Sequence, residues 1–379
     1  MNTRMVRLRD FDPILMLAAL GLVALGTLLI YSGSLSQFGP PSAFDFSHPV
    51  VRQAVFAVAG LLLALLVARS DYRALGALSA GLYIAAIAAL VFVLAAGETI
   101  YGSRRWILIG DMQIQPSEIA KLAVIIALAK YLSDHQDSIR SLRVFAISLA
   151  MAAVPALLVF VEPDLGSAII FAVIWLAMVT VAGARWQHLA GLFATALVAV
   201  PFLLIGLVQD YQRARIALWF NPESDPQGAG FNVLQGKISI GSGGLFGKGL
   251  AEGTQTQLDY LRTETTDYVF SVLGEELGFV GALVLFALFI ILLWRGLRVA
   301  ELSRDMFGRL LATGMVIFIL LQTFINVGVN VGLLPVTGIP LPFVSQGGSS
   351  LITLFLGLGI LQSILLRHRP FTFRNFYGR

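Results

Sequence analysis

Charged side chains gather at the ends of the apolar runs of this chain, and the first cluster combines both signs. It contains Arg104 and Arg105, followed by Glu118 and Lys121. Glu118 and Lys121 are three residues apart. On a helix this spacing places the carboxylate and the ammonium group on one face, and Ser117 before them could cap that helix. A lysine inside an apolar run is costly, so the pair either braces neighbouring helices or faces a polar cavity.

A second cluster places two carboxylates in one short segment, Glu162-Pro163-Asp164, followed by Gly166 and Ser167. Asp164 would be favourable near the positive end of a helix that begins there. The two carboxylates could instead bind a cation through their oxygens, although two side chains do not complete such a site. Both interpretations remain open at this point.

The third cluster surrounds Asp267, in the stretch Thr263-Glu264-Thr265-Thr266-Asp267-Tyr268. Asp267 opens an apolar run, so it is either a helix cap or a reactive carboxylate. Glu275 and Glu276 lie about two turns deeper in the same run, where a carboxylate must be protonated, paired or facing water.

Uncharged polar residues follow in the next apolar run and after it. Gln322, Asn326 and Asn330 are spaced four residues apart on one helix face, which favours hydrogen bonds between helices. Residues 334–350 are rich in Pro and Gly and carry no charge. Irregular backbone at membrane depth is tolerated only against protein or a water-filled cavity, so we expect a re-entrant segment that lines a cavity.

The elements that must position these clusters are apolar helices. Hydrophobic residues make up 57% of the 379 residues and charged residues only 13%, which excludes a soluble globule and a disordered chain. The net charge of +4 gives no indication of a nucleic-acid partner, and the absence of Cys excludes thiolate metal sites. We predict an all-α polytopic membrane protein with about ten transmembrane helices. The ten apolar runs cover residues 13–31, 50–68, 74–96, 117–132, 143–161, 166–182, 187–208, 268–294, 308–333 and 350–366.

The basic residues predict how the helices are oriented. With ten spans, 17 of the 26 Lys and Arg residues fall on the side of the two termini, so both termini should be cytoplasmic. One long extracytoplasmic loop, residues 209–267, then separates spans seven and eight. We treat residues 1–379 as a single membrane domain, and all three charged clusters then lie at its outer end.

At these residues the chain resembles the SEDS family (shape, elongation, division and sporulation), and within it the RodA type more than the FtsW type. The resemblance runs over nearly the whole chain. Its strongest stretches are Arg105-Trp106-Ile107, Gln115-Pro116-Ser117-Glu118, Glu162-Pro163-Asp164-Leu165-Gly166-Ser167, Asp225-Pro226, Lys237 to Gly249, Thr266-Asp267, Gly274-Glu275-Glu276-Leu277-Gly278, Pro340-Leu341-Pro342-Phe343 and Gly347-Gly348-Ser349-Ser350.

The resemblance implies a peptidoglycan glycosyltransferase that polymerises lipid II during cell elongation, at the outer face of the bacterial cytoplasmic (inner) membrane. It implies work with a class B penicillin-binding protein and other membrane proteins of the elongation complex. By motif position, Asp267 matches the family's essential aspartate, and Glu118 and Lys121 match its ion pair. The chain departs from the family pattern before Thr266, where Pro-Glu and His are usual, and at Gln346, where Tyr is common.

The implied reaction inverts the anomeric centre in one displacement, which needs a base on the acceptor hydroxyl and positive charge near the departing pyrophosphate. Our hypothesis makes Asp267 the base. The basic candidates for holding pyrophosphate are Arg104, Arg105, Lys121, Arg213 and Arg215. Further candidates for binding substrate or supporting the site are Glu118, Asp164, Lys248, Glu275, Ser345 and Ser349. A divalent cation, Mg²⁺ or Mn²⁺, could share the task.

Two other functions stay open. A flippase for a lipid-linked precursor would also use polar groups at membrane depth, but it needs them reachable from both faces. A non-catalytic scaffold for the crosslinking partner would tolerate loss of the charge of Asp267.

Overall fold

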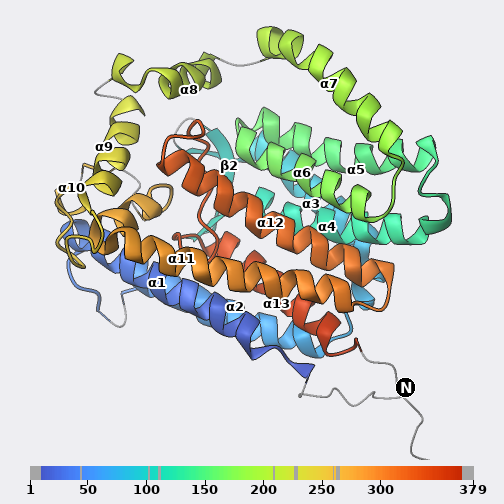
Figure 1. Cartoon of the computed structure of the whole chain (residues 1–379), viewed down its shortest axis with the longest axis horizontal. Coiled ribbons are helices and arrows are strands. Elements are labelled where there is room, and N and C mark those ends of the chain that lie inside the picture. The colour runs from blue at the N-terminus through green and yellow to red at the C-terminus, as the bar shows by residue number, and fades with distance from the viewer. Residues whose placement is uncertain are drawn as a thin grey trace, which may run out of the picture.

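The protein is a helical bundle, seen here in a computed structural model that describes residues 10–42, 45–100, 103–109, 112–207, 210–225, 229–258, 260–261 and 265–368. Its long helices run roughly side by side (Figure 1). The helices are α1 (Pro13–Phe38), α2 (Pro49–Arg69), α3 (Ala74–Ala96), α4 (Pro116–Asp134), α5 (Leu142–Val161), α6 (Leu165–Val181), α7 (Trp186–Leu207), α8 (Asp210–Phe220), α9 (Ala229–Ser242), α10 (Thr254–Gln257), α11 (Val269–Leu302), α12 (Met306–Asn330) and α13 (Gly348–Leu365). Short 3-10 turns cover Gln136–Ser138 and Pro222–Ser224.

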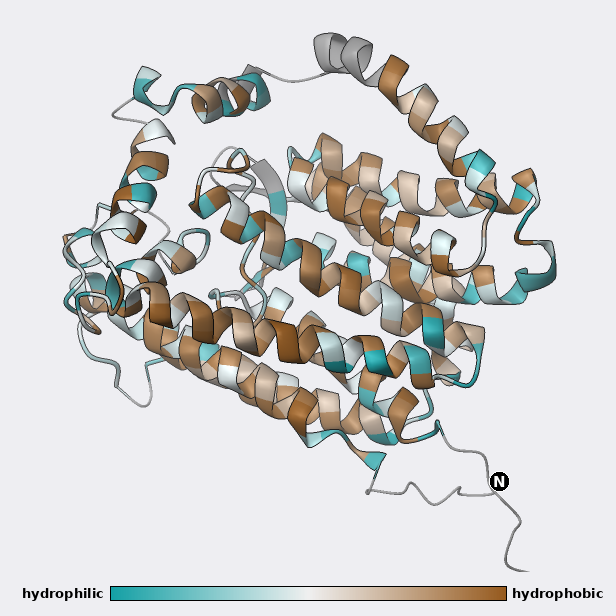
Figure 2. Cartoon of the chain, viewed as in Figure 1, coloured by the Kyte–Doolittle hydropathy of each residue, from teal (hydrophilic) through white to brown (hydrophobic). Residues whose placement is uncertain are grey.

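Each of the ten predicted apolar runs forms a helix, which confirms the all-α membrane fold. Within the described residues, seven helices are long and apolar enough to cross a membrane: α1, α2, α3, α5, the part of α11 from Gly278, α12 and α13. The count of ten spans stays a prediction. Figure 2 shows apolar residues along the long helices and hydrophilic residues mostly at helix ends and in loops.

The centre of the bundle is formed by α4, α12 and α13, most of whose side chains are buried. α12 packs against α4, α6 and α11, and α13 packs along α2. At one end, the backbone N–H of Asp12 donates to Gln362 Oε1 (3.0 Å), so the start of α1 adjoins the end of α13. We call this the terminal end, and the opposite end, which holds Asp164 and Asp267, the distal end.

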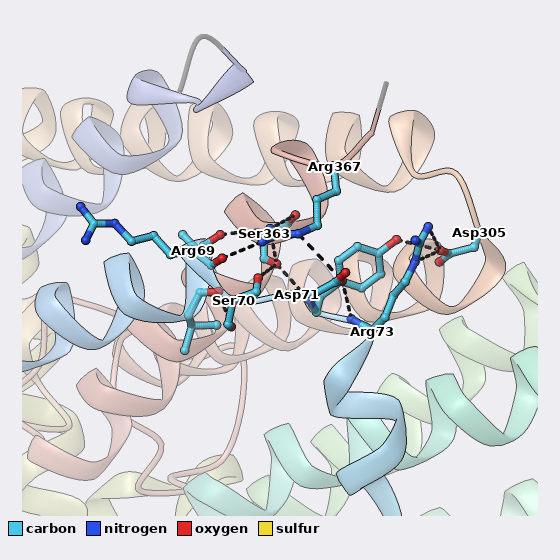
Figure 3. A network of polar contacts seen from close by, with 10 residues as sticks. Arg69, Ser70, Asp71, Arg73, Asp305, Ser363 and Arg367 are labelled. Atoms are coloured by element: carbon cyan, nitrogen blue, oxygen red, sulfur yellow. Dashed lines mark hydrogen bonds and ion pairs between the residues drawn. The ribbon is translucent and has the colours of Figure 1, made fainter. Parts of the chain in front are cut away.

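A polar network closes the terminal end (Figure 3). Asp305, before α12, accepts hydrogen bonds from Tyr72 Oη (2.7 Å) and from Arg73 Nε and Nη2 (3.1 Å each). Ser363 Oγ on α13 donates to the carbonyl of Ser70 (2.7 Å), and Arg367 Nη2 donates to that of Arg69 (2.6 Å). The connection between α2 and α3 is thereby fastened to two other helix ends.

One element was not expected. Between α3 and α4 the chain forms a small antiparallel sheet of β1 (Glu98–Ile100), β2 (Ser103–Ile109) and β3 (Met112–Ile114), in the order β1-β2-β3. The register pairs Thr99 with Arg104 and Leu108 with Gln113. Strands this short give little periodic signal in a sequence. The sheet matters because β2 carries Arg105 to the distal end.

Candidate active site

Asp267 lies in a turn two residues before α11, and its main chain is held by α12. Asn326 Nδ2 (3.1 Å) and Asn330 Nδ2 (2.8 Å) both donate to the carbonyl of Asp267. Asn330 Oδ1 also accepts from Ser271 Oγ (2.7 Å), which confirms the predicted hydrogen bonds between helices. Asp267 does not cap α11, because the N-cap residue is Tyr268 and it makes no side-chain capping bond. The carboxylate of Asp267 is therefore not used as a helix cap.

The segment between α12 and α13 packs on the Asp267 turn and has no helix from 331 to 347. Ser345 Oγ donates to the carbonyl of Thr266 (2.5 Å) and accepts from the N–H of Leu341 (2.8 Å). The N–H of Gln346 donates to the carbonyl of Thr265 (2.9 Å), whose hydroxyl donates to Gln346 Oε1 (3.0 Å). The predicted irregular backbone is confirmed, and it packs against protein. Gln346, a departure from the family pattern, here bonds Thr265, the last residue of the other departing stretch.

Gly338 brings Arg105 and Asp267 together. This residue has φ of 73°, and a Cβ placed on it would lie 3.4 Å from Arg105 Nη2 and 3.7 Å from Asp267 Oδ2. The guanidinium of Arg105 and the carboxylate of Asp267 therefore flank the same bare glycine. Any side chain at this position would occupy the space beside both groups.

Two further charged groups complete this side of the site. Arg105 Nη1 lies 3.7 Å from Asp164 Oδ2, and both side chains are largely buried. Arg215, on α8, donates from Nη1 to the carbonyl of Val336 (3.0 Å), two residues before Gly338. Asp164 also caps α6 by accepting from the N–H of Ser167 (2.9 Å), as predicted from its position before the helix.

Burial sets the electrostatics of this cluster. It raises the pKa of Asp267 above its usual range, while Arg105 and Arg215 counteract part of the rise. Burial and the neighbouring Asp164 raise the pKa of Glu162 to about 8. A carboxylate with a raised pKa is a stronger base once ionised, which suits proton abstraction near neutral pH.

Several buried polar atoms beside these charges have no hydrogen-bond partner among the residues that the structure describes: Arg105 Nε, Glu162 Oε1 and Thr337 Oγ1. Buried polar atoms are normally paired, and an unpaired one costs about 1–3 kcal/mol. Unpaired donors and acceptors at one end of the bundle are what a site for a polar ligand requires.

Glu118 and Lys121 form an ion pair of 2.6 Å, and both side chains are almost fully buried. Gln322 Nε2 on α12 donates to Glu118 Oε2 (3.2 Å), and Lys121 Nζ lies 5.1 Å from the centroid of the Phe318 ring. These partners belong to α4 and α12, so the pair braces the two central helices.

The expected Ser117 cap of α4 is wrong. Gln115 is the N-cap residue without a side-chain bond, Pro116 begins the helix, and the buried Ser117 Oγ has no partner.

The remaining candidates lie in separate places. Lys248 Nζ contacts Glu275 Oε1 (2.7 Å), whose other oxygen accepts from Thr256 Oγ1 (3.0 Å), so Glu275 is paired and anchors the loop before α10. Ser349 Oγ accepts from the N–H of Gln115 (3.2 Å) and thus joins α13 to α4.

Two arginine candidates are not placed beside Asp267. Arg213 is exposed on α8. The backbone of Arg104 lies in β2, whereas its side chain is outside the described residues. In the part of the chain that the structure describes, no group of three or more His, Asp or Glu side chains is arranged to hold a metal ion.

Sequence reasoning missed Gly338 as a member of the site. The signal was the stretch Val336-Thr337-Gly338-Ile339-Pro340, in which a glycine precedes a buried proline-rich segment. The contact with Arg105 could not be found from it, because these residues are more than 200 positions apart.

The model of one protein family, described as cell cycle proteins of the FtsW, RodA and SpoVE type, matches residues 13–369 of the chain. The peptidoglycan glycosyltransferase MrdB of Escherichia coli (strain K12) is 39% identical over 354 residues, which cover 93% of each chain. Stage V sporulation protein E of Bacillus subtilis (strain 168) is 38% identical, over 93% of this chain and 96% of that protein.

Solved structures agree with the sequence relatives. A chain of a peptidoglycan synthase complex, solved to describe the structural coordination of polymerisation and crosslinking, superimposes with a TM-score of 0.78 at 33% identity, over 94% of this chain and 97% of that chain. The rod shape determining protein RodA of Thermus thermophilus gives a TM-score of 0.67 at 32% identity, over 94% of this chain and 96% of that chain.

Proposed function

We infer that this chain, which belongs to the FtsW, RodA and SpoVE (SEDS) family, is a peptidoglycan glycosyltransferase of cell wall synthesis that uses Asp267 as its general base. The glycosyltransferase activity follows from relatives that are similar over nearly their whole length. The substrate that we propose is lipid II, with one molecule or growing strand as donor and another as acceptor.

The observation that carries the role of Asp267 is its position beside Arg105 at Gly338. A carboxylate of raised pKa can accept the proton of the acceptor hydroxyl, and a neighbouring guanidinium can bind a phosphate oxygen. The reaction needs the base and the phosphate-binding cation close enough to contact the same bound substrates, and Asp267 and Arg105 meet this requirement.

In the proposed step, the acceptor oxygen forms a bond to the anomeric carbon while the bond from that carbon to the pyrophosphate oxygen breaks. The hydroxyl proton passes to Asp267, and the bonding electron pair leaves with the lipid pyrophosphate. Attack and departure on opposite faces invert the anomeric centre. We assign to Arg105 and Arg215, the two cations that act electrostatically on Asp267, the task of stabilising the charge of the leaving group. Lys121 is used elsewhere, in its pair with Glu118.

The basic residues predict that the terminal end is cytoplasmic, so the distal end would face outward in the bacterial inner membrane. The partner that we propose is a class B penicillin-binding protein, together with other proteins of the elongation complex. A divalent cation could be recruited with the substrate. Two protein carboxylates do not complete a cation site, and the oxygens of pyrophosphate could supply further ligands.

A flippase is less well supported, because the incompletely paired charged groups Arg105 and Glu162 lie at the distal end. The test is to supply the purified full-length chain with lipid II in liposomes, and to measure both glycan strands and translocated lipid. We expect strands without an added polymerase, and a loss of activity with EDTA if a cation takes part. Translocation without polymer would overturn the proposal.

A further inference from the structure

Helix α11 is interrupted near the distal end, although its residues form one continuous run. Gly278 has φ of 64° and ψ of −159°, so the helix consists of a short part, residues 269–277, and a long part from 278 to 302. The short part follows Asp267 directly and spans about 13 Å at 1.5 Å per residue. The long part is one of the candidate membrane spans.

A glycine-rich turn, residues 243–249, supplies the hydrogen bonds that the interruption removes. The N–H groups of Lys248 and Gly249 donate to the carbonyls of Glu275 and Glu276 (3.0 Å each). The N–H groups of Phe279 and Val280 donate in turn to the carbonyls of Gly244 and Leu245 (3.0 Å each). Without this turn, four backbone groups next to the apolar span would lack partners, at a large cost in a membrane.

The approach is so close that only glycine fits at its contact points. A Cβ on Gly243 would lie 1.9 Å from the carbonyl oxygen of Gly274, and one on Gly247 would lie 2.1 Å from that of Glu276. The turn and the interrupted helix are therefore one rigid unit.

In a loop surrounded by water, charged side chains usually point outward and large apolar side chains point inward. In this turn the directions are reversed. Lys248 points inward to Glu275, whereas Leu245 and Phe246 are 65% and 78% exposed. Leu250 is also exposed, at 41%. Large apolar groups that point outward beside charges that point inward suit an apolar surrounding.

The exposed apolar side chains continue directly into the outward face of the membrane span. Phe279 and Val280, whose backbone pairs with the turn, are 57% and 43% exposed, and Leu283 one turn further along is 51% exposed. If α11 spans the membrane, this exposed face contacts lipid, because no other part of the chain covers it in the described residues. The surface of the turn is an extension of that face.

We propose that Leu245, Phe246 and Leu250 insert into the bilayer leaflet at the distal end and anchor there the helix segment that carries Asp267. The occupant of this apolar surface is the acyl and headgroup boundary of the lipid. The anchor fixes the depth of the Asp267 turn relative to the membrane, and a lipid-linked substrate presents its pyrophosphate at a fixed depth too.

The chain contains no Cys, so a single introduced Cys reports one position. A nitroxide label is attached to Phe246→Cys in the full-length protein in lipid nanodiscs. The rate at which the label collides with oxygen, which is enriched in lipid, is compared with its rate of collision with a water-soluble nickel chelate. Leu283→Cys on the span is the lipid control, and Glu252→Cys, exposed beyond the turn, is the water control.

We expect the ratio of oxygen to nickel collisions at 246 to approach that at 283 and to lie well above that at 252, because oxygen partitions into lipid whereas the nickel chelate stays in water. Phe246→Asp should lower polymerisation in liposomes about tenfold, whereas Phe246→Leu should retain it because an apolar side chain still inserts. Nickel access at 246 equal to that at 252 would overturn the proposal. Shielding from both reagents would also overturn it, since a protein surface would then cover the turn.

Discussion

The two ends of the bundle use the same residue types in different ways. At the terminal end, Asp305 accepts four hydrogen bonds, from Tyr72, from two nitrogens of Arg73 and from the N–H of Gly308 (2.8 Å). Those donors lower its pKa below the usual range. At the distal end, burial raises the pKa of Asp267 and Glu162, and Arg105 keeps an unpaired nitrogen.

The difference separates a polar network that joins helix ends from a buried cluster with incompletely paired groups. The hydrogen bonds and ion pairs of the terminal network join helix ends (Figure 3). The distal cluster is buried and incompletely paired, a state that costs stability unless a substrate completes it. Residue types alone do not distinguish the two ends, whereas their hydrogen-bond partners do.

The largest expected effect on stability concerns α4, which carries one ion pair toward each end. Glu118→Gln leaves Lys121 buried without its counter-charge, so we expect a loss of about 3–5 kcal/mol in the free energy of unfolding. Asp134→Asn breaks the exposed pair with Lys130 (2.7 Å) and should cost about 0.2–1 kcal/mol. Unfolding in detergent, followed by circular dichroism, compares the two. Equal losses would show that burial does not distinguish these pairs.

The next prediction compares the replacement of one arginine at each end of the bundle. Arg105→Met should lower the rate of lipid II polymerisation by about 10²–10³, as does the loss of one group that stabilises developing charge. Arg73→Met removes two hydrogen bonds to Asp305 and should lower the melting temperature by a few degrees while activity stays within about twofold. If Arg73→Met abolished activity while the protein remained folded, the terminal network would also belong to the reaction.

A pair of glycines with similar φ sharpens the comparison. Gly338→Ala adds a methyl group beside Arg105 and Asp267 at φ of 73°, and we expect roughly tenfold slower polymerisation. Gly39→Ala also places a side chain at positive φ (69°), but nothing lies within 4 Å of its Cβ, so only stability should fall. Polymerisation assays with equal amounts of folded protein compare the two variants. They separate the effect of backbone strain from that of a methyl group beside Arg105 and Asp267. Equal rates in the two variants would remove Gly338 from the site.

The smallest expected effect is on the pH dependence of stability. The raised pKa of Glu162 means that its contribution is fully present below its ordinary value of 4.5 and is lost as pH rises toward about 8. The lowered pKa of Asp305 acts in the opposite direction: its contribution is present above 3.8 and is lost as pH falls through the folded-state value.

Glu162→Gln should therefore flatten the decline of the melting temperature between pH 4.5 and about 8, by ~2 °C or more. Melting curves of the protein and of this variant across this pH range provide the measurement. A decline of the same slope in both would contradict the assignment of Glu162.

Apolar runs predicted the helices well, because a membrane span must be apolar along its whole length. The pair Glu118 and Lys121 was also predictable, since its spacing of three residues is a local property of one helix. Ser117 failed as a cap because Pro116 beside it begins the helix instead.

Three features were not predictable from local sequence. β2 brings Arg105 to Asp267, Gly338 provides the space between them, and the turn at 243–249 completes the interrupted α11. Each depends on contacts between residues far apart in the chain, and no periodicity of one segment records them. Asp267 was recognisable from its motif, whereas its surroundings required the structure.

The measurement that tests the central role of Asp267 most directly is made on Asp267→Asn in the full-length protein. Binding of lipid II and its polymerisation are followed on the same folded sample, with Asp305→Asn as the matched variant from the terminal end. We predict that Asp267→Asn binds lipid II but polymerises it at least about 10²-fold more slowly, whereas Asp305→Asn still polymerises. Polymerisation by Asp267→Asn at the rate of the unchanged protein would contradict the assignment of Asp267 as the base.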